Sequence, residues 1–393
     1  MSEWKKVSLS EMGIVSRGKS KHRPRNDTRL YGGRYPFIQT GDIGAAGLYV
    51  TDYSQTYNEE GLAQSKLWEK NTLCITIAAN IADTALLAFP ACFPDSIMGF
   101  VPHKDVANVK YVKYCFDILK KDCQQISQGT AQDNLSWKKL STIKFPCPPL
   151  EVQNRIATIL SRYDSLIENY QKQIKLLEEA AQRLYKEWFV DLRFPGHENT
   201  NIIDGVPEGW EKKSIGEIGE YLNGFAFKPS DWQKSGKPII KIKEMGNGVS
   251  NDTPRNNGER VPAKYLVKAG DLLFSWSATL MVIVWSGEEG WLNQHLFKVT
   301  PSKGIEREFL LQSISNTIEE FQNLTTGSTM KHIQRNKLDQ VFVNVPNDEI
   351  MKRYSSIAEK ERTEILHLSS QIRLLTEARD RLLPKLMSGE ITV

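Results

Sequence analysis

Two stretches of the chain carry hydrophobic residues at spacings that alternate between four and three. The first stretch consists of Ile156, Leu160, Tyr163, Ile167, Tyr170, Ile174, Leu177, Ala181, Leu184 and Trp188. The second, with two charged interruptions, consists of Tyr354, Ala358, Glu361, Ile365, Leu368, Ile372, Leu375, Arg379, Leu382 and Leu386. Such spacing forms the a/d seam of a coiled-coil helix. Each stretch therefore predicts a helix roughly 50–60 Å long, at 1.5 Å per residue.

The two predicted helices are each other's nearest candidate partners, because both hydrophobic stripes lie in one chain. A pair formed within the chain predicts an antiparallel coiled coil with a pseudo-two-fold axis. Heptad spacing does not tell whether the partner belongs to the same molecule, so a coiled coil between two copies of the chain stays open. The residues expected to face a partner helix or to dock partner subunits are Ile167, Ile174, Leu177, Leu184, Ile365, Ile372, Leu375 and Leu382.

Ahead of each predicted helix, short hydrophobic runs alternate with clusters of Gly, Pro, Asn and Asp, which is typical of strands and turns. The clearest strand-length runs are residues 36–38, 73–78, 238–242 and 282–285. Residues 272–285 form the longest uncharged hydrophobic run. That run is too short to cross a bilayer and predicts one or two buried strands. The best helix candidates within these regions are residues 111–119 and 309–321.

The two halves of the sequence repeat each other. Five pairs of similar residues are 206 positions apart: Trp4 and Trp210, Leu9 and Ile215, Glu11 and Glu217, Gly13 and Gly219, and Gly18 and Gly224. The separation falls to 200 at Leu73 and Leu273. It is 198 at Pro148 and Pro346, because the second copy has shorter loops. One long repeat of this kind indicates a tandem duplication rather than a solenoid.

These patterns together predict an α+β fold with two β-rich domains and two long helices. The expected order is a first domain at residues 1–149, a helix at 150–190, a linker with the second domain at 191–346, and a helix with a tail at 347–393. Each helix follows a proline segment, which the interior of a helix does not accept.

Composition narrows the class of partner only slightly. The 393 residues are 40% hydrophobic and carry a net charge of +4, so the chain can bury real cores, and a nucleic-acid partner is compatible but not required. Five cysteines without a C-x-x-C pair favour a reducing cytoplasm and buried thiols over disulfides or zinc. The first residues lack the hydrophobic core of a signal peptide. We therefore expect a cytoplasmic protein with no membrane partner.

Residues 13–20 match the phosphate-binding pattern G-x-x-x-x-G-K-[ST]. That pattern binds phosphate only between a buried strand and a helix. The residues that follow, with Pro24 among several charges, do not predict a helix. The second copy keeps both glycines but has Phe-Ala in place of Lys19-Ser20. We therefore interpret the glycines as turn residues and the match as chance.

A short basic segment gives the clearest nucleic-acid signal. Six arginines and lysines fall within residues 17–29, against one acidic residue, Asp27. Such density suits contacts with phosphates and base edges, while a solvated basic loop stays open as the alternative. The DNA-binding residues expected in this segment are Arg17, Lys19, Lys21, His22, Arg23 and Arg25.

Polar residues elsewhere in both copies extend this expectation. Asn293, Gln294 and His295 form a polar triplet close to Trp291. The triplet suits base contacts, although the same side chains could satisfy buried backbone groups. The remaining expected DNA-binding residues, most of them near the glycine turns that precede the long helices, are Thr130, Gln132, Asn134, Lys228, Ser328, Lys331, His332 and Arg335.

The sequence offers no catalytic constellation and no metal site. Motifs of zinc proteases, serine hydrolases, dinucleotide-binding folds and DNA amino-methyltransferases are missing. The six histidines are scattered without ligand spacing. We therefore expect a chain that performs no chemistry and binds no cofactor of its own.

The segments around the predicted helices resemble one family. Residues 148–156, PPLEVQNRI, resemble the P-P-L-x-x-Q-x-x-I start of the first conserved helix of type I restriction–modification specificity subunits. Residues 184–191, LYKEWFVD, resemble the end of that helix. Residues 206–210, VPEGW, look like the start of the family's second target-recognition domain, and residues 382–391, LLPKLMSGEI, look like its C-terminal signature. The resemblance covers the whole chain and is most specific in the helices.

The resemblance implies a concrete function. Each β-rich domain would read a few base pairs of double-stranded DNA, and the two half-sites would differ because the domains differ. The paired helices would set the spacing between half-sites and dock two methyltransferase subunits, which hold S-adenosylmethionine; restriction subunits could join them. The second helix departs from the family pattern, with Met351 where the first copy has Gln153. The alternative is a coiled-coil scaffold with two β-domains for sugar or protein ligands.

Overall fold

The computed structural model of the chain describes residues 4–78, 80–127, 135–324 and 335–393. The chain forms two compact units. The first unit comprises residues 1–169 and 373–393, and the second comprises residues 170–372. Each long helix therefore contributes one segment to each unit, and the fold is a mixture of helices and strands.

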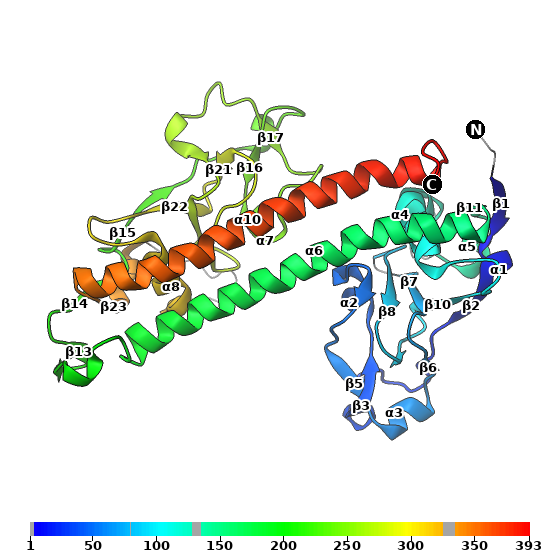
Figure 1. Cartoon of the computed structure of the whole chain (residues 1–393), viewed down its shortest axis with the longest axis horizontal. Helices are drawn as coiled ribbons and strands as arrows, with labels where there is room; N and C mark the ends of the chain where they lie inside the picture. The colour runs from blue at the N-terminus through cyan, green and yellow to red at the C-terminus, as the bar shows by residue number, and fades with distance from the viewer. Residues whose placement is uncertain (1–3, 79, 128–134, 325–334) are drawn as a thin grey trace. The chain divides into compact units, whose positions relative to one another are not determined.

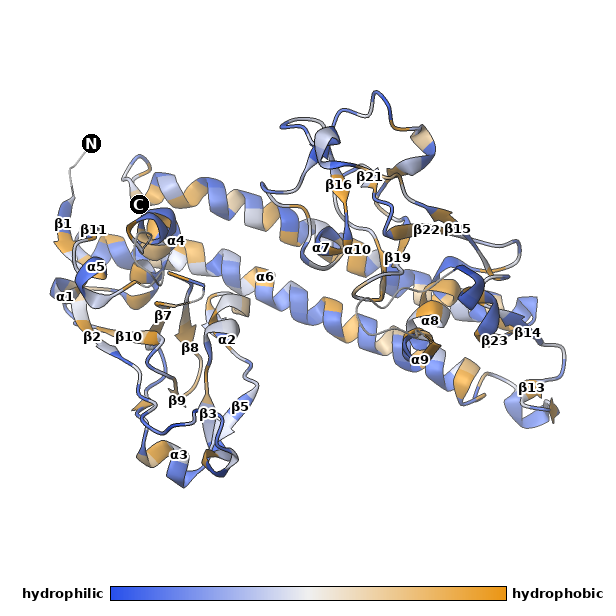
Figure 2. Cartoon of the chain, turned by 180° about the vertical axis from the view of Figure 1, so that it is seen from behind, coloured by the Kyte–Doolittle hydropathy of each residue, from blue (hydrophilic) through white to orange (hydrophobic). Residues whose placement is uncertain are grey.

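Long helices lie where the heptad seams predict them (Figure 1). Helix α6 spans Leu150–Tyr185 and continues through a π-helical turn, η2, at Lys186–Val190. Helix α10 spans Asp348–Met387. Figure 2 shows hydrophobic residues recurring along both helices between longer hydrophilic stretches. Both helices therefore show the periodic recurrence of hydrophobic residues that a coiled-coil seam requires.

The first unit contains a five-stranded sheet with the order β2-β10-β7-β8-β4. Its strands are β2 Gly13–Arg17, β10 Ile97–Pro102, β7 Leu73–Thr76, β8 Thr84–Leu87 and β4 Tyr49–Val50. A second sheet has the order β5-β3-β9-β6 and consists of β5 Gln55–Tyr57, β3 Tyr31–Phe37, β9 Ala91–Cys92 and β6 Leu67–Trp68. A separate antiparallel pair is formed by β1 Lys5–Ser8 and β11 Lys144–Cys147.

Short helices connect these strands, and one longer helix lies within the first unit. They are α1 Leu9–Met12, η1 Thr28–Leu30, α2 Thr40–Ala45, α3 Glu59–Ala63, α4 Val109–Ser127 and α5 Trp137–Leu140. Helix α4 contains the predicted helix at residues 111–119, so that prediction is confirmed. Its buried face joins the unit's main hydrophobic core, together with Phe100, Phe145, Ile156 and Leu160.

The second unit repeats the same plan. Its larger sheet has the order β15-β22-β19-β20, with β15 Gly219–Asn223, β22 Leu296–Pro301, β19 Leu272–Ser275 and β20 Met281–Val284. Its smaller sheet has the order β17-β16-β21-β18, with β17 Arg255–Asn256, β16 Lys237–Ile240, β21 Gly290–Leu292 and β18 Leu266–Val267. Two further antiparallel pairs are β14 Glu211–Ser214 with β23 Phe342–Val345, and β12 Ile202–Ile203 with β13 Val206–Pro207.

The helices of the second unit confirm the remaining helix prediction. They are η3 His197–Asn199, η4 Pro229–Asp231, α7 Ile242–Asn247, η5 Ala263–Tyr265, α8 Arg307–Asn316, α9 Ile318–Leu324 and η6 Arg335–Gln340. The predicted helix at residues 309–321 is divided between α8 and α9, with Thr317 between them. The long hydrophobic run at 272–285 forms two strands, β19 and β20.

Strand order makes the duplication visible in the structure. The four strands β2-β10-β7-β8 of the first unit have the same order as β15-β22-β19-β20 of the second, and β5-β3-β9-β6 has the same order as β17-β16-β21-β18. The register corrects one sequence match. Leu73 pairs with Phe100, and Leu272 pairs with Val299. The counterpart of Leu73 is therefore Leu272, not Leu273, and a slip of one residue would turn the side chain to the other face.

The repeated glycines are not turn residues, so that interpretation of the sequence was wrong. Gly13 and Gly219 begin β2 and β15, and none of the four matched glycines has a φ in the left-handed region. A Cβ on Gly18 would collide with the backbone oxygens of Phe93 and Pro94. A Cβ on Gly224 would collide with the Asn293 carbonyl. Glycine is needed there because two backbones approach closely.

Candidate nucleic-acid interface

In the first unit, three segments meet at one end of the larger sheet. The Gly18 N–H donates to the Ile97 carbonyl (2.8 Å), which holds the start of the basic segment against β10. The Ile77 N–H donates to the Ser96 carbonyl (3.0 Å), and the Leu135 N–H donates to the Ile77 carbonyl (2.9 Å). The basic segment, the β9–β10 connection and the β7–β8 hairpin loop therefore lie next to one another.

The second unit brings its own candidate residues to the equivalent end of its sheet. The Gly224 N–H donates to the Leu296 carbonyl (3.0 Å), and the Trp276 N–H donates to the His295 carbonyl (3.5 Å). These bonds are the counterparts of Gly18 with Ile97 and of Ile77 with Ser96. The basic segment of one copy and the Asn-Gln-His triplet of the other thus occupy corresponding ends of corresponding sheets. The sequence alone does not show this placement, because the basic segment and the triplet do not align with each other in the duplication.

Hydrogen bonds hold the basic segment in a defined conformation. The Lys21 and His22 N–H groups both donate to Gln64 Oε1, at 2.6 and 3.0 Å. Ser65 Oγ donates to the Lys19 carbonyl (2.7 Å). Tyr31 Oη donates to the Arg25 carbonyl (2.7 Å). The segment is therefore a fixed platform, so its side chains lose less freedom when they bind a ligand.

The cations of this platform fall into two groups. Arg25 Nη2 lies 2.5 Å from Asp95 Oδ1, and Arg23 Nη2 lies 3.7 Å from Asp95 Oδ2. His22 Nε2 and Arg29 Nη2 lie 2.8 and 2.7 Å from Asp27 Oδ2. Hydrogen bonds from Arg29 hold the pKa of the Asp27 carboxyl well below its ordinary value, so Asp27 is charged at neutral pH.

Arg17, Lys19 and Lys21 form the second group. Their side chains are exposed and form no ion pair with any carboxylate in the described part of the chain. Arg17 closes β2, so the glycine-to-glycine run of the phosphate-binding pattern is mostly a strand rather than a loop. The helix that such a pattern requires is replaced by the three-residue η1, much later in the chain. The exposed cations therefore suit the phosphate backbone of DNA, but the segment lacks the loop and helix that bind the phosphates of a nucleotide.

The polar triplet of the second unit divides by burial. Asn293 is only 4% exposed, and its Nδ2 donates to Gln294 Oε1 (2.8 Å). Asn293 Oδ1 also accepts a hydrogen bond from the His295 N–H (3.4 Å). Burial and this bond both favour the alternative in which Asn293 satisfies a backbone group instead of contacting a base. Gln294 is partly exposed, and His295 is exposed with its ring 5.8 Å from that of Trp276. Gln294 and His295 are therefore the members that a ligand can reach.

The remaining candidates in the described chain are more peripheral. Lys228 is exposed, and its backbone N–H donates to Asp231 Oδ2 (2.7 Å) at the start of η4. Arg335 is exposed at the first position of η6. Six further candidates lie outside the described residues: Thr130, Gln132, Asn134, Ser328, Lys331 and His332.

Seam residues of the long helices are buried or half-buried in their units. Ile167 and Ile365 are buried, while the other six residues expected to face a partner are half-buried: Ile174, Leu177, Leu184, Ile372, Leu375 and Leu382. In the first unit, the charged seam residue Arg379 donates through Nη1 to Asp164 Oδ1 of α6 (2.7 Å). In the second unit, Tyr185 of α6 packs against Tyr354 of α10, with ring centroids 6.4 Å apart.

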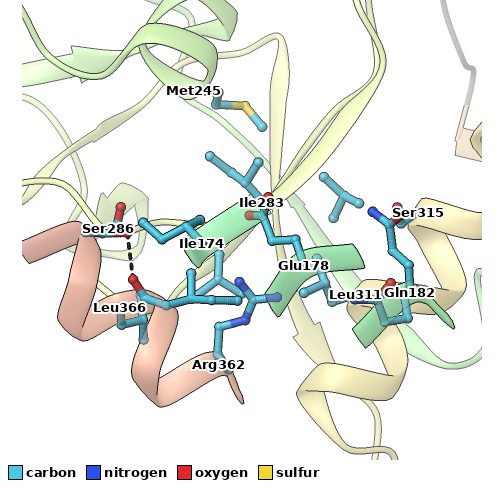
Figure 3. Close-up of a pocket in the computed structure, with 15 residues that line it drawn as sticks. Ile174, Glu178, Gln182, Met245, Ile283, Ser286, Leu311, Ser315, Arg362 and Leu366 are labelled. Carbon is cyan, nitrogen blue, oxygen red and sulfur yellow. Dashed lines mark hydrogen bonds between the residues drawn. The ribbon is translucent and has the colours of Figure 1, made fainter. Parts of the chain in front are cut away.

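A pocket of about 330 Å³ lies in the second unit between α6, α10, α8 and β20 (Figure 3). Arg362 reaches into it from α10, and its Nε donates to Glu308 Oε2 (3.0 Å). The positions of Arg362 and Gln312 correspond, 198 residues earlier, to Asp164 and Tyr114. Those two bond to each other, with the Tyr114 hydroxyl donating to the Asp164 carboxylate. The first copy thus has a hydrogen-bonded tyrosine and aspartate at the positions where the second copy has two residues that line the pocket, Gln312 and Arg362.

Other kinds of site find little support. No three His, Cys, Asp or Glu side chains in the described ranges gather closely enough to hold a metal ion. None of the helices that the described residues form has both the length and the hydrophobicity needed to cross a membrane. Four of the five cysteines are buried, as expected of small core side chains, and Cys147 is half-buried.

Comparisons with known proteins point in one direction. The family model of the type I restriction modification DNA specificity domain matches residues 1–179 and 207–375. The chain is 25% identical to the type I restriction enzyme MjaIX specificity subunit of Methanocaldococcus jannaschii, over all of this chain and 94% of that protein. It is 23% identical to the HindI specificity subunit of Haemophilus influenzae, over the full length of both. The crystal structure of the type I restriction–modification S subunit from M. genitalium has the same fold, with a TM-score of 0.59 and 15% identity over 98% of this chain and 96% of that one.

Proposed function

Because the chain belongs to the family of type I restriction–modification DNA specificity domains, we propose that it is the subunit that selects the DNA site of such a complex. The observation that supports this most directly is that the same end of the larger sheet carries candidate DNA-binding residues in both units. In each unit, polar or basic side chains lie at the corresponding end of the larger sheet, on segments fixed by corresponding hydrogen bonds. A conserved frame that presents different side chains suits two readers of different sequences.

The site is bipartite and asymmetric in this proposal. The first unit presents a basic platform, whereas the second presents Gln294 together with His295, whose ring lies beside that of Trp276. Dense positive charge favours phosphate contacts, and amide or imidazole groups favour base edges. Each unit would therefore read its own half-site, with a different balance of the two contacts.

The long helices set the spacing between half-sites in this proposal and pair in antiparallel fashion. Contacts within each unit support the pairing. In the first unit, Asp164, early in α6, contacts Arg379, late in α10. In the second unit, Tyr185, late in α6, contacts Tyr354, early in α10. An order of early with late, then late with early, is the order of an antiparallel coiled coil.

The partners follow from the family. Two methyltransferase subunits dock on the helices, restriction subunits are further candidates, and S-adenosylmethionine resides on the methyltransferase. The chain itself performs no chemistry in this proposal. Incubation of the purified chain with DNA, S-adenosylmethionine and ATP checks this, because methyl transfer or ATP turnover by the chain alone would contradict it.

The decisive experiment exchanges one reader. The chain, assembled with its methyltransferase subunits, is given a library of DNA duplexes, and the methylated products are sequenced. Replacement of residues 1–149 by those of a relative should change one half of the methylated motif and leave the other half and the spacing intact. A change in both halves would contradict the modular assignment. Absence of salt-sensitive duplex binding would favour a scaffold for other ligands instead.

A further inference from the structure

Asp95 and Arg25 form a close pair at the end of the first unit's sheet, although they are 70 residues apart in the chain. Asp95 lies in the short connection between β9 and β10, and Arg25 lies on the fixed basic platform. The Asp95 side chain is 39% exposed and that of Arg25 is 49% exposed. Both groups are therefore held together where a ligand can reach them.

Arg25 has more N–H donors available for a ligand than its neighbour Arg23. Arg23 folds back, and its Nη1 donates to the Ser20 and His22 carbonyls, at 2.6 and 2.8 Å. The Arg25 side chain donates only to Asp95 among the described residues. A guanidinium carries five N–H donors in a planar fork, so Arg25 keeps most of its donors for a ligand while the carboxylate fixes its orientation.

The charge around Arg25 disfavours a phosphate as its ligand. Asp95 lies 2.5 Å from Arg25 and 3.7 Å from Arg23, so it offsets part of the charge of these two cations, and the same carboxylate would repel a phosphate that approached Arg25. A base edge carries no net charge, so it is not repelled. Guanine offers two acceptors, O6 and N7, in the major groove at the spacing of the guanidinium fork. Arg17, Lys19 and Lys21, which no carboxylate neutralises in the described chain, suit phosphates better.

We infer that Arg25, positioned by Asp95, reads a guanine in the first half-site, and that Arg17, Lys19 and Lys21 bind the flanking phosphates. The inference rests on the proposed function, because it assigns a base to the site proposed there. Arg25 is the residue that contacts the base. Asp95 is a positioning residue, because it acts by holding the guanidinium fork in the orientation that a bidentate contact needs.

The test uses the full chain with its methyltransferase subunits, S-adenosylmethionine and duplexes in which every position of the first half-site is varied. In the wild-type complex, one position should be strongly selective for a G·C pair. Asp95→Ala and Arg25→Lys should each lower the preference for G at that position, because neither variant keeps a positioned guanidinium fork. Loss of the whole bidentate contact corresponds to a drop of roughly 5- to 150-fold, which is the upper limit for either variant. Arg25→Lys keeps the charge, so its salt dependence of binding should stay close to that of the wild type. Asp95→Asn, which keeps an acceptor oxygen, should retain part of the preference.

Lys19→Ala is the matched control. It should leave the sequence preference intact and lower the slope of log affinity against log salt by about one unit. Selectivity in the second half-site should be unchanged in all variants, which shows that they are folded and assembled. Should Asp95→Ala prove poorly folded, Arg25→Lys still tests the contact with guanine.

Three outcomes would overturn the inference. One is a first half-site with no position selective for G·C. The second is an Arg25→Lys variant with unchanged preference. The third is relaxed preference after both Asp95 substitutions but not after Arg25→Lys, which would make Asp95 itself the reader, through the amino group of cytosine. A wild-type complex that methylates a bipartite site but shows any of these results refutes only this inference. A wild-type complex that methylates no specific site refutes the proposed function.

Discussion

Asp164 on α6 accepts hydrogen bonds from both the Arg379 guanidinium on α10 and the Tyr114 hydroxyl on α4. The Asp164 side chain is 6% exposed and that of Arg379 is 28% exposed. A carboxylate this deeply buried is tolerated only with partners. Arg379, which interrupts the hydrophobic seam of α10, is therefore the cationic partner of this buried side chain.

Arg379→Ala should destabilise the protein by an amount at the lower end of about 3–5 kcal/mol, because it leaves a buried carboxylate without its cation. Thermal or urea unfolding measures the loss. Arg381→Ala is the control, since the Arg381 side chain is 78% exposed and, among the described residues, pairs only with Glu377 on the same helix; it should cost about 0–1 kcal/mol. Equal effects of the two substitutions would contradict the role given to Arg379.

Gly18→Ala should destabilise the first unit, because its Cβ would collide with the backbone carbonyls of Phe93 and Pro94, which cannot rotate away. A cost of about 1–3 kcal/mol is expected for such overpacking. Gly41→Ala is the matched control: Gly41 has open space around its Cβ position and no φ in the left-handed region. Unfolding midpoints of the two variants provide the comparison, and a neutral Gly18→Ala would disprove the close approach.

Glu361, the other charged interruption of the seam, predicts a pH-dependent stability. Its Oε2 is buried and unpartnered in the described structure, and burial raises the pKa of the Glu361 carboxyl above its ordinary value of 4.5. The folded state therefore holds the proton more tightly than the unfolded state. The charged form lowers stability above the raised folded-state pKa, and this penalty vanishes as pH falls below the unfolded-state value.

Glu361→Gln should accordingly raise the melting temperature at pH 7.5, and its advantage over the wild type should shrink as the pH falls toward 4.5. Glu359→Gln, at an exposed position on the same helix, is the control and should change little at either pH. Melting curves across this range measure both. An advantage of Glu361→Gln that grows on acidification would show that the sign is wrong.

The thiols should react at very different rates. Burial raises the pKa of the Cys123 thiol to about 11 and raises that of Cys74 and Cys115 further, so thiolate is scarce at neutral pH. Cys147 is half-buried. A thiol-reactive dye should therefore label Cys147 first in the native protein and all five cysteines after unfolding. Early labelling of a cysteine other than Cys147, located by peptide mapping, would contradict this order.

Periodicity predicted the local elements well. The heptad spacing located α6 and α10, and the hydrophobic runs located β7, β16 and the β19–β20 pair. The matched Glu11 and Glu217 also have a local cause, because each carboxylate caps the turn that follows a serine: Glu11 accepts from the Ser8 N–H, and Glu217 accepts from the Ser214 N–H. Such signals lie within a few residues of each other and are therefore readable in the sequence.

Long-range relationships were not readable in the same way. Asp95 carries no sequence signal that links it to Arg25, and the placement of the basic segment and the Asn-Gln-His triplet at corresponding ends of the two sheets appears only once strand order is known. The glycines were misread because glycine serves equally for a left-handed turn and for close backbone approach. Only the neighbouring strands decide which of the two applies at Gly18 and Gly224.

The π-helical turn at Lys186–Val190 gives the end of α6 a property of its own. The Asp191 N–H donates to the Lys186 carbonyl (2.8 Å), a span of five residues instead of four. The turn therefore takes up one extra residue, about 100° of helical rotation. Trp188 and Phe189, both within this turn, pack against Tyr354. Deletion of any single residue here would reset the helical phase, so the direction in which the linker departs is encoded by a residue count rather than by any particular side chain.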